Sequence, residues 1–247
     1  MYIMSEKQAT TLKPRAGAPD ISFSAERIQS VPKTDEGRKA FVESLESLPF
    51  IKELERKGAL TNLVYVPNRT EFEKLTGVGA DTYWFDLILA TTLPGLEGEL
   101  QTPQSVLITR SFFEGDMVIS NNEAVCTLLH EGKHIADSYW GIRYEHRPDI
   151  KVEDAQKDFI REIVEIRGYY AEFEAVSKGL VVSIFYLDKQ LSCFREHVGN
   201  VILALEKDKS ADNAAAAIER EVWQAQLEEM GDPELVIKAA YRTALSE

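Results

Sequence analysis

Apolar residues recur at the spacing of one helix face through most of the second half of the chain. Side chains three and four residues apart line one side of a helix, so this spacing predicts helices that pack against neighbours. Four segments show the pattern: residues 152–178, 182–207, 211–230 and 233–245. Gly179 follows the first segment, at a position where glycine commonly ends a helix. The second half is therefore predicted to consist of consecutive helices.

The first half of the chain has shorter apolar runs, which predict a small mixed sheet with helices around it. Runs bounded by proline, glycine or aspartate predict strands at residues 63–66, 105–109 and 117–120. Helical spacing predicts a helix over residues 35–57, which Pro49 is expected to kink or break. Two features stay open: the cap of a short helix at residues 70–75, either Asn68 or Thr70, and the choice of strand or helix at residues 82–93. The expected fold class is α+β.

A helix is predicted at residues 120–140, between the sheet and the helical half. The run 120–122 consists of good N-cap residues, and Glu123 places a negative charge near the positive end of the helix. Apolar residues recur at helical spacing as far as Gly141, which offers a stop. Gly132 lies inside this helix, where glycine costs about 1 kcal/mol relative to alanine. We therefore expect a neighbouring element to pack closely against Gly132.

The same helix carries two histidines with the spacing of metal ligands. His130 and His134 are four residues apart, so their imidazoles lie one above the other and can bind one ion. Glu131 lies about 100° round the helix, where its carboxylate can reach a metal-bound water as a general base. Two surface histidines at this spacing by chance are the alternative, but the chain has only four histidines. The sequence His-Glu-Gly-Lys-His resembles the active helix of the zincin metallopeptidases.

A catalytic zinc site usually has three protein ligands, so a third ligand is needed. A histidine six residues beyond the motif would give the metzincin pattern, but Trp140 occupies that position. His146 lies in a polar segment and His197 in a predicted helix, and both are expected to be exposed or hydrogen-bonded rather than to bind metal. The remaining candidates are carboxylates on the helix that follows, which is the gluzincin arrangement.

We favour Glu165 over Glu162 as the third ligand. Glu162 lies close to the apolar face of its helix, whereas Glu165 flanks that face. Gly168 is three residues after Glu165, and a glycine inside a helix indicates the close approach of another backbone, here the one carrying the two histidines. The run 165–169 also resembles the third-ligand segment of gluzincin-like families. Pairing of either glutamate with Arg161 or Arg167 along the helix is the alternative.

The resemblance implies a single zincin-like catalytic domain over residues 34–247, with an α/β lobe to about 141 and a helical lobe over 142–247. It implies a zinc-dependent metallopeptidase in which His130, His134 and Glu165 bind Zn²⁺ and Glu131 is the general base. The substrate would be a peptide or protein whose extended backbone pairs with an edge strand, at residues 105–109 or 117–120. Two rival functions stay open: a catalytically inactive zincin-fold binding or regulatory module, and a helical protein that binds no metal.

Three side chains near the motif have open roles. Tyr169 or Tyr170 could donate a hydrogen bond to the oxyanion of the transition state, although tyrosines on an apolar helix face are more often core. Asp137 follows His134 by three residues, so it could orient that imidazole or close the end of the helix.

Composition limits the partners. The net charge of −13 argues against nucleic acid, whose phosphates would be repelled. Two cysteines are too few for a disulfide framework, and Cys126 is interpreted as small buried packing. No signal peptide or membrane segment is recognised, so the expectation is a cytoplasmic protein, with signal-less export left open. Residues 1–33 contain prolines among polar residues and are expected to form a flexible arm. The oligomeric state is not predicted.

Overall fold

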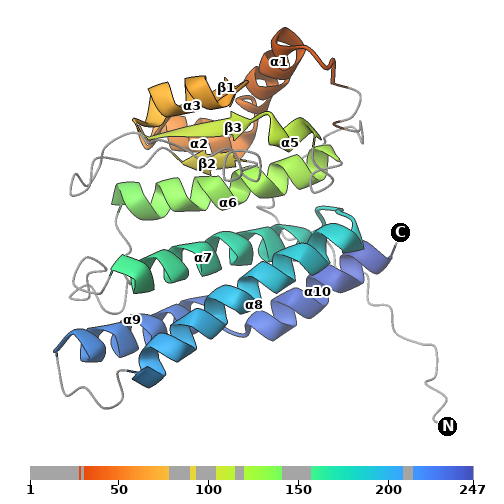
Figure 1. The fold of residues 1–247 in the computed structure, drawn as a ribbon. Coiled ribbons are helices and arrows are strands. Elements are labelled where there is room, and N and C mark those ends of the chain that lie inside the picture. Colours follow the sequence, from red (N-terminus) through yellow and green to blue (C-terminus); the bar gives the residue numbers. More distant parts are fainter. Residues whose placement is uncertain are drawn as a thin grey trace.

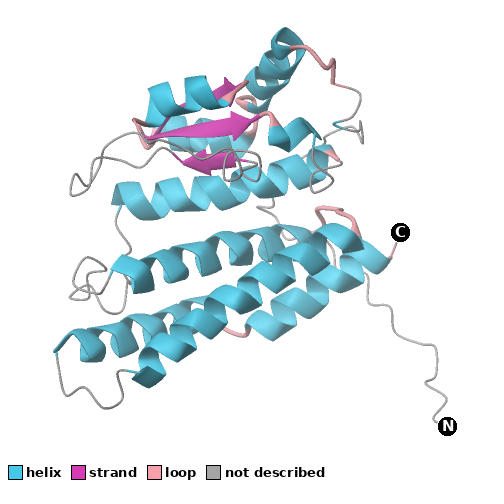
Figure 2. Cartoon of the chain, in the orientation of Figure 1, coloured by secondary structure: helices cyan, strands magenta, loops and turns pink. Residues whose placement is uncertain are grey.

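One long helix separates the sheet from the helical half of the molecule (Figure 1). The computed structural model describes residues 28, 31–77, 90–92, 104–114, 120–140, 157–207 and 214–246. Within these residues, the strands and the short helices lie on one side of α6 (Asn121–Trp140), and the remaining long helices lie on the other. Figure 2 shows that the strands are confined to the first of these layers. The expected α+β class, with a small mixed sheet and a mainly helical second half, is confirmed.

The break expected at Pro49 is present. Helix α1 (Asp35–Leu45) begins at Thr34, whose hydroxyl accepts a hydrogen bond from the Gly37 amide at 3.1 Å. Helix α2 (Pro49–Arg56) begins at the proline itself, where the missing N–H costs nothing because the first turn of a helix has no internal acceptor for it. Gly58 then turns the chain with a φ of 74°, a conformation that side chains with a Cβ rarely adopt.

The sheet has the order β1-β3-β2, which the order along the chain does not reveal. Strand β1 (Leu60–Val66) runs parallel to β3 (Gln104–Thr109), and β2 (Ala90–Thr92) runs antiparallel to β3 on its other side. The expectation that residues 105–109 form a substrate-binding edge strand is therefore wrong, because both sides of that strand are already hydrogen-bonded. The other candidate, residues 117–120, lies outside the described residues except for Ser120.

Two further elements complete this layer. Helix α3 (Arg69–Thr76) is capped by Asn68, whose side chain accepts a hydrogen bond from the Glu71 amide at 3.0 Å, so Thr70 is not the cap. The short helix α5 (Ser111–Glu114) follows β3 and was not expected from the sequence. Of the ambiguous segment 82–93, residues 90–92 form β2 and residues 82–89 lie outside the part of the chain that the structure describes.

Helix α6 begins with a reciprocal pair of hydrogen bonds. The hydroxyl of Ser120 accepts from the Glu123 amide at 3.2 Å, and the Glu123 carboxylate accepts from the Ser120 amide at 3.1 Å. Glu123 is fully buried and also accepts from the amide and the hydroxyl of Ser183, so it joins this helix end to the segment before α8. The packing expected at Gly132 is also present, because a Cβ there would lie 3.3 Å from Cδ1 of Leu54 in α2.

The second half consists of long helices, as expected. These are α7 (Lys157–Ser177), α8 (Ile184–Lys207), α9 (Ala214–Met230) and α10 (Pro233–Leu245). Helix α7 lies directly below α6 and packs against α8, α9 and α10 (Figure 1). Residues 152–156 and 211–213, which the sequence adds to α7 and α9, lie outside the described residues.

The principal core runs through both layers. It extends from Leu45 and Ile51, through the buried face of α6, to Phe173 and Tyr186 in the lower helices. Cys126 is buried within it as a free thiol, as expected. Among the helices described, none has the length and apolar character needed to span a membrane.

Candidate metal centre

The two histidines of α6 and one glutamate of α7 face each other across the helix pair. One ligand atom from each of His130, His134 and Glu165 lies within 4.8 Å of the other two. The two carboxylate oxygens of Glu165 lie 3.3 Å from His130 Nε2 and 3.7 Å from His134 Nε2. A tetrahedral zinc with ligand bonds of about 2.0–2.1 Å holds its ligand atoms about 3.3 Å apart. The spacing of the three side chains therefore fits one such ion.

Gly168 makes room for one of these ligands. A Cβ at this position would lie 2.6 Å from Nε2 of His130 and 2.7 Å from its Cδ2 and Cε1. The sequence indicated a close approach of another backbone at Gly168; the structure shows instead that the imidazole ring of His130 occupies the space. The helix that approaches is nevertheless α6, as expected. An alanine at residue 168 would collide with a candidate ligand.

A second glutamate of α7 holds His130 from its other side. One carboxylate oxygen of Glu172 lies 2.8 Å from Nδ1 of His130. The other oxygen accepts a hydrogen bond from the Tyr186 hydroxyl at 2.6 Å. Metal-binding histidines usually donate their second ring N–H to such a carboxylate. The sequence reasoning assigned Glu172 no role. The signal was its position seven residues after Glu165, two turns along the same helix face.

The ionisable groups of this cluster shift one another's pKa values. Burial opposes a charge on His130, but the hydrogen bonds with Glu165 and Glu172 outweigh it and raise the pKa of the imidazole to about 10. Burial likewise opposes a charge on Glu165, yet the hydrogen bond with His130 and the nearby imidazoles lower the pKa of this carboxyl to about 2. His134 behaves differently, because burial and the neighbouring His130 lower its pKa. Without a metal, the centre thus holds an ion pair between His130 and Glu165.

Glu131 is buried beside these groups. Its side chain belongs to the same helical turn as His130, and the residue is 8% exposed. Its negative charge favours the charged form of both imidazoles, although burial and His130 lower the pKa of His134 overall. Glu131 is therefore close enough to act electrostatically on the imidazoles without being one of the three clustered ligands.

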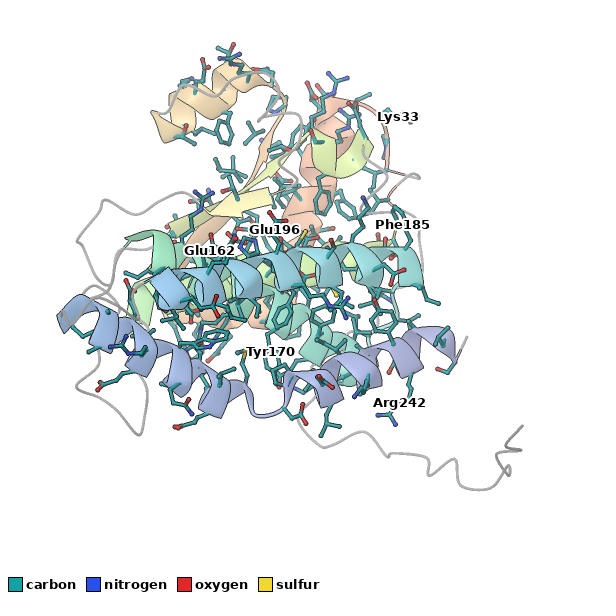
Figure 3. The ribbon with its side chains drawn as sticks, turned by 60° about the horizontal axis from the view of Figure 1, so that its bottom comes forward. Lys33, Glu162, Tyr170, Phe185, Glu196 and Arg242 are labelled. Atoms are coloured by element: carbon teal, nitrogen blue, oxygen red, sulfur yellow. The ribbon has the colours of Figure 1, made fainter. Side chains whose placement is uncertain are left out.

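Glu162, the alternative third ligand, lies elsewhere. Its carboxylate accepts hydrogen bonds from Nδ1 of His197 at 2.7 Å and from the side-chain amide of Asn200 at 3.1 Å. Both partners belong to α8, beside which Glu162 is drawn in Figure 3. His197 is thus hydrogen-bonded rather than grouped with the metal ligands, as expected, and its ring stacks on Tyr169. His146 lies outside the residues that the structure describes.

The tyrosines considered for the oxyanion have other partners. The Tyr170 hydroxyl donates to the carbonyl of Met230 at 2.7 Å, beside the turn between α9 and α10 (Figure 3). The ring of Tyr169 packs edge-on against His130 with centroids 4.5 Å apart, and its hydroxyl is hydrogen-bonded to Cys193. Tyr169 therefore contacts the ring of His130, and Tyr170 joins α7 to the end of α9, while the oxyanion role stays a prediction.

Asp137 does not orient His134. Its two oxygens accept hydrogen bonds from Arg167 at 2.6 and 3.0 Å, and both residues are buried. Arg167 also donates to Gln226 and Glu229 of α9, so it ties α6, α7 and α9 together rather than pairing along its own helix. Among the described residues, nothing accepts a hydrogen bond from the buried Nδ1 of His134.

The donor set is one that can bind a divalent metal ion, zinc included. Two imidazole nitrogens and one carboxylate are the ligands of a common class of catalytic zinc site, which keeps a fourth position for water or substrate. The Glu172 carboxylate orients the imidazole of His130, and Gly168 leaves space for that ring; both features are consistent with a metal-binding histidine. No protein-family model, curated protein or solved structure matches this chain.

Proposed function

We propose that this chain is a zinc-dependent metallopeptidase with a zincin-like fold. The observation that carries the proposal is the convergence of His130, His134 and Glu165 from two helices, at distances suited to one tetrahedral ion. Glu131 is buried and adjacent in sequence to the first ligand, and we assign it the role of general base. The sheet on one side of the motif helix and the helices on the other agree with the lobes that the zincin resemblance implies.

The chain's own residues would divide the chemistry as follows. When bound, zinc lowers the pKa of a coordinated water to about 7 and polarises the scissile carbonyl. Glu131 would accept the proton of the attacking water, direct the water at the carbonyl carbon, and deliver the proton to the leaving amine. Glu172 and Tyr169 would hold the ring of His130 in place. The substrate is a peptide or protein, and no nucleic acid partner is proposed because the chain carries a net charge of −13.

The test begins with metal content. The protein purified without added metal should contain about one zinc per chain, and His130→Ala or His134→Ala should lose it because two ligands bind weakly. Less than about a tenth of an equivalent of zinc, with no other metal in its place, would refute the metal site. Any metal bound in place of zinc would appear in the same elemental measurement.

Activity is tested separately with an unfolded protein such as casein. Glu131→Gln should keep its zinc and lose hydrolysis, because the amide preserves shape but cannot accept a proton. Zinc without hydrolysis in the wild type would replace the peptidase by the alternative function, an inactive zincin-fold binding module. Loss of zinc in Glu131→Gln would show that Glu131 ligates the metal, contrary to the role assigned here.

A further inference from the structure

A buried path of hydrogen bonds connects the candidate metal centre to α8. It runs from Nδ1 of His130 to Glu172 at 2.8 Å, and from Glu172 to the Tyr186 hydroxyl at 2.6 Å. The same hydroxyl lies 3.4 Å from the hydroxyl of Thr127, one turn before His130. The path therefore starts in α6, crosses α7 and α8, and returns to α6.

We propose that Glu172 and Tyr186 are positioning residues that fix His130 for metal binding, so that α8 forms part of the metal centre. This inference rests on the proposed function. Neither residue is among the three clustered ligands. Both would act through the imidazole of His130, Glu172 directly and Tyr186 through the Glu172 carboxylate.

Burial makes the arrangement specific. Tyr186 is fully buried and Glu172 is 2% exposed, so water cannot replace either hydrogen bond. A carboxylate has two oxygens, and here each has one buried donor: the imidazole on one side and the phenol on the other. Removing the phenol hydroxyl would take away the buried donor of one carboxylate oxygen, and the carboxylate would be expected to turn from its present orientation.

The effect on the metal follows from the geometry of imidazole. A histidine that binds zinc through Nε2 must keep its proton on Nδ1 and hold the ring plane in line with the metal. Glu172 supplies both conditions by accepting from Nδ1, and Tyr186 fixes the carboxylate that does so. His134 provides a contrast within the same site, because its buried Nδ1 has no hydrogen-bond partner among the described residues. We infer that His130 is the preorganised ligand of the pair.

The path makes a quantitative prediction for zinc affinity. Substituting a residue that orients a metal ligand typically weakens metal binding by about 10–100-fold. Glu172→Gln should fall in this range, because the amide can retain one acceptor but offers N–H groups to the Tyr186 side. Tyr186→Phe removes a single oxygen atom and should weaken zinc binding by at least about threefold, since the carboxylate itself remains.

The matched control is Tyr241→Phe. The Tyr241 hydroxyl donates to Asp188, which lies in α8 as Tyr186 does, also at 2.6 Å, and the hydrogen bonds described for His130 and Glu172 do not involve this pair. The three variants and the wild type are compared by competition with a zinc chelator, with thermal unfolding of the metal-free proteins measured in parallel. The visible spectrum of bound Co²⁺ adds a readout of coordination geometry that a loss of stability alone does not change.

The expected result is weaker zinc binding and an altered Co²⁺ spectrum in Glu172→Gln and Tyr186→Phe, with Tyr241→Phe equal to the wild type. Zinc affinities within about twofold of the wild type in both site variants would overturn the inference, and so would an equal loss in the control. A wild type that binds no zinc would instead refute the proposed function. Folding of each variant is confirmed by its unfolding transition.

Discussion

Gly168→Ala is the sharpest test of how the two helices meet. Replacing a glycine inside a helix by alanine normally stabilises the helix by about 1 kcal/mol. At residue 168, however, the new methyl group would lie 2.6 Å from Nε2 of His130, the atom expected to bind zinc. Carbon atoms and their neighbours pack best at about 3.5–4.0 Å, so the imidazole must retreat by roughly 1 Å.

Two neighbours prevent the ring from moving freely. Glu172 holds Nδ1 at 2.8 Å, and the Tyr169 ring packs against the imidazole with centroids 4.5 Å apart. Metal–ligand distances tolerate deviations of only about 0.2 Å, so a displacement of roughly 1 Å would remove His130 from the coordination of zinc. We expect zinc affinity to fall at least tenfold, which corresponds to about 1.4 kcal/mol. The metal-free fold should lose at most about 2 kcal/mol, because the helix gain of about 1 kcal/mol offsets only part of an overpacking cost of about 1–3 kcal/mol.

The assay is chelator competition for zinc affinity, together with urea unfolding of the metal-free protein. Gly199→Ala in α8 is the control, because a Cβ there would meet no atom within 4 Å. It should raise the free energy of unfolding by about 0.5–1 kcal/mol and leave zinc binding unchanged. If Gly168→Ala binds zinc as tightly as the wild type, the ring of His130 is not held against α7 and the reasoning fails.

Three further predictions concern the same helices. Glu165→Ala should weaken zinc binding well over tenfold in chelator competition. Glu162→Ala should leave zinc binding nearly intact and only destabilise the fold, because the Glu162 carboxylate is hydrogen-bonded to α8. If the two affinities are reversed, Glu162 is the ligand. Zinc binding at pH 7 should release about one proton from His130, because its pKa is raised to about 10 and an imidazole must be neutral to bind metal. Zinc affinity should therefore rise with pH up to the pKa of His130. Calorimetry in two buffers with different ionisation enthalpies measures the released proton, and no release would contradict a charged His130 in the metal-free protein. Arg167→Ala should lower the free energy of unfolding by up to about 3 kcal/mol, because the buried Asp137 would lose both hydrogen bonds from the guanidinium and keep Lys133, 3.3 Å away. A double variant with Asp137→Ala that loses the sum of both single effects would show that the pair does not interact.

The local features of the site were predictable because they depend on residues near one another in sequence. The spacing of His130 and His134 follows from helix geometry, and a cap was expected within residues 120–122; the structure has the cap at Ser120. Glu165 could be preferred over Glu162 because Gly168 indicated where another element comes close. What glycine alone could not reveal was the nature of that neighbour, since a missing Cβ makes room for a side chain as readily as for a backbone.

Features that depend on tertiary contacts were missed. Strand β3 is central because β1 and β2 pair with it on opposite sides. Short apolar runs in a sequence do not indicate the order of the strands in a sheet, so this position could not be predicted. Asp137 was assigned to His134 or the helix end, but its partner is Arg167 of the next helix. Glu172 could have been noticed two turns after Glu165, yet its importance depends on Tyr186, which comes from α8.

The position of α6 between the two layers has a consequence for dissecting the protein. One side of this helix packs on α2 and the sheet, and the other packs on α7 (Figure 1). A fragment that ends after α6 would expose its lower side, including the buried Cys126, His130 and Asp137, to solvent. A fragment that begins with α7 would lose the cover over the side of α7 that carries Glu165, Gly168 and Glu172. We therefore expect neither half to fold alone, because one continuous core runs through both halves. The two halves expressed together as separate chains should reassemble, because each half then covers the apolar surface of the other.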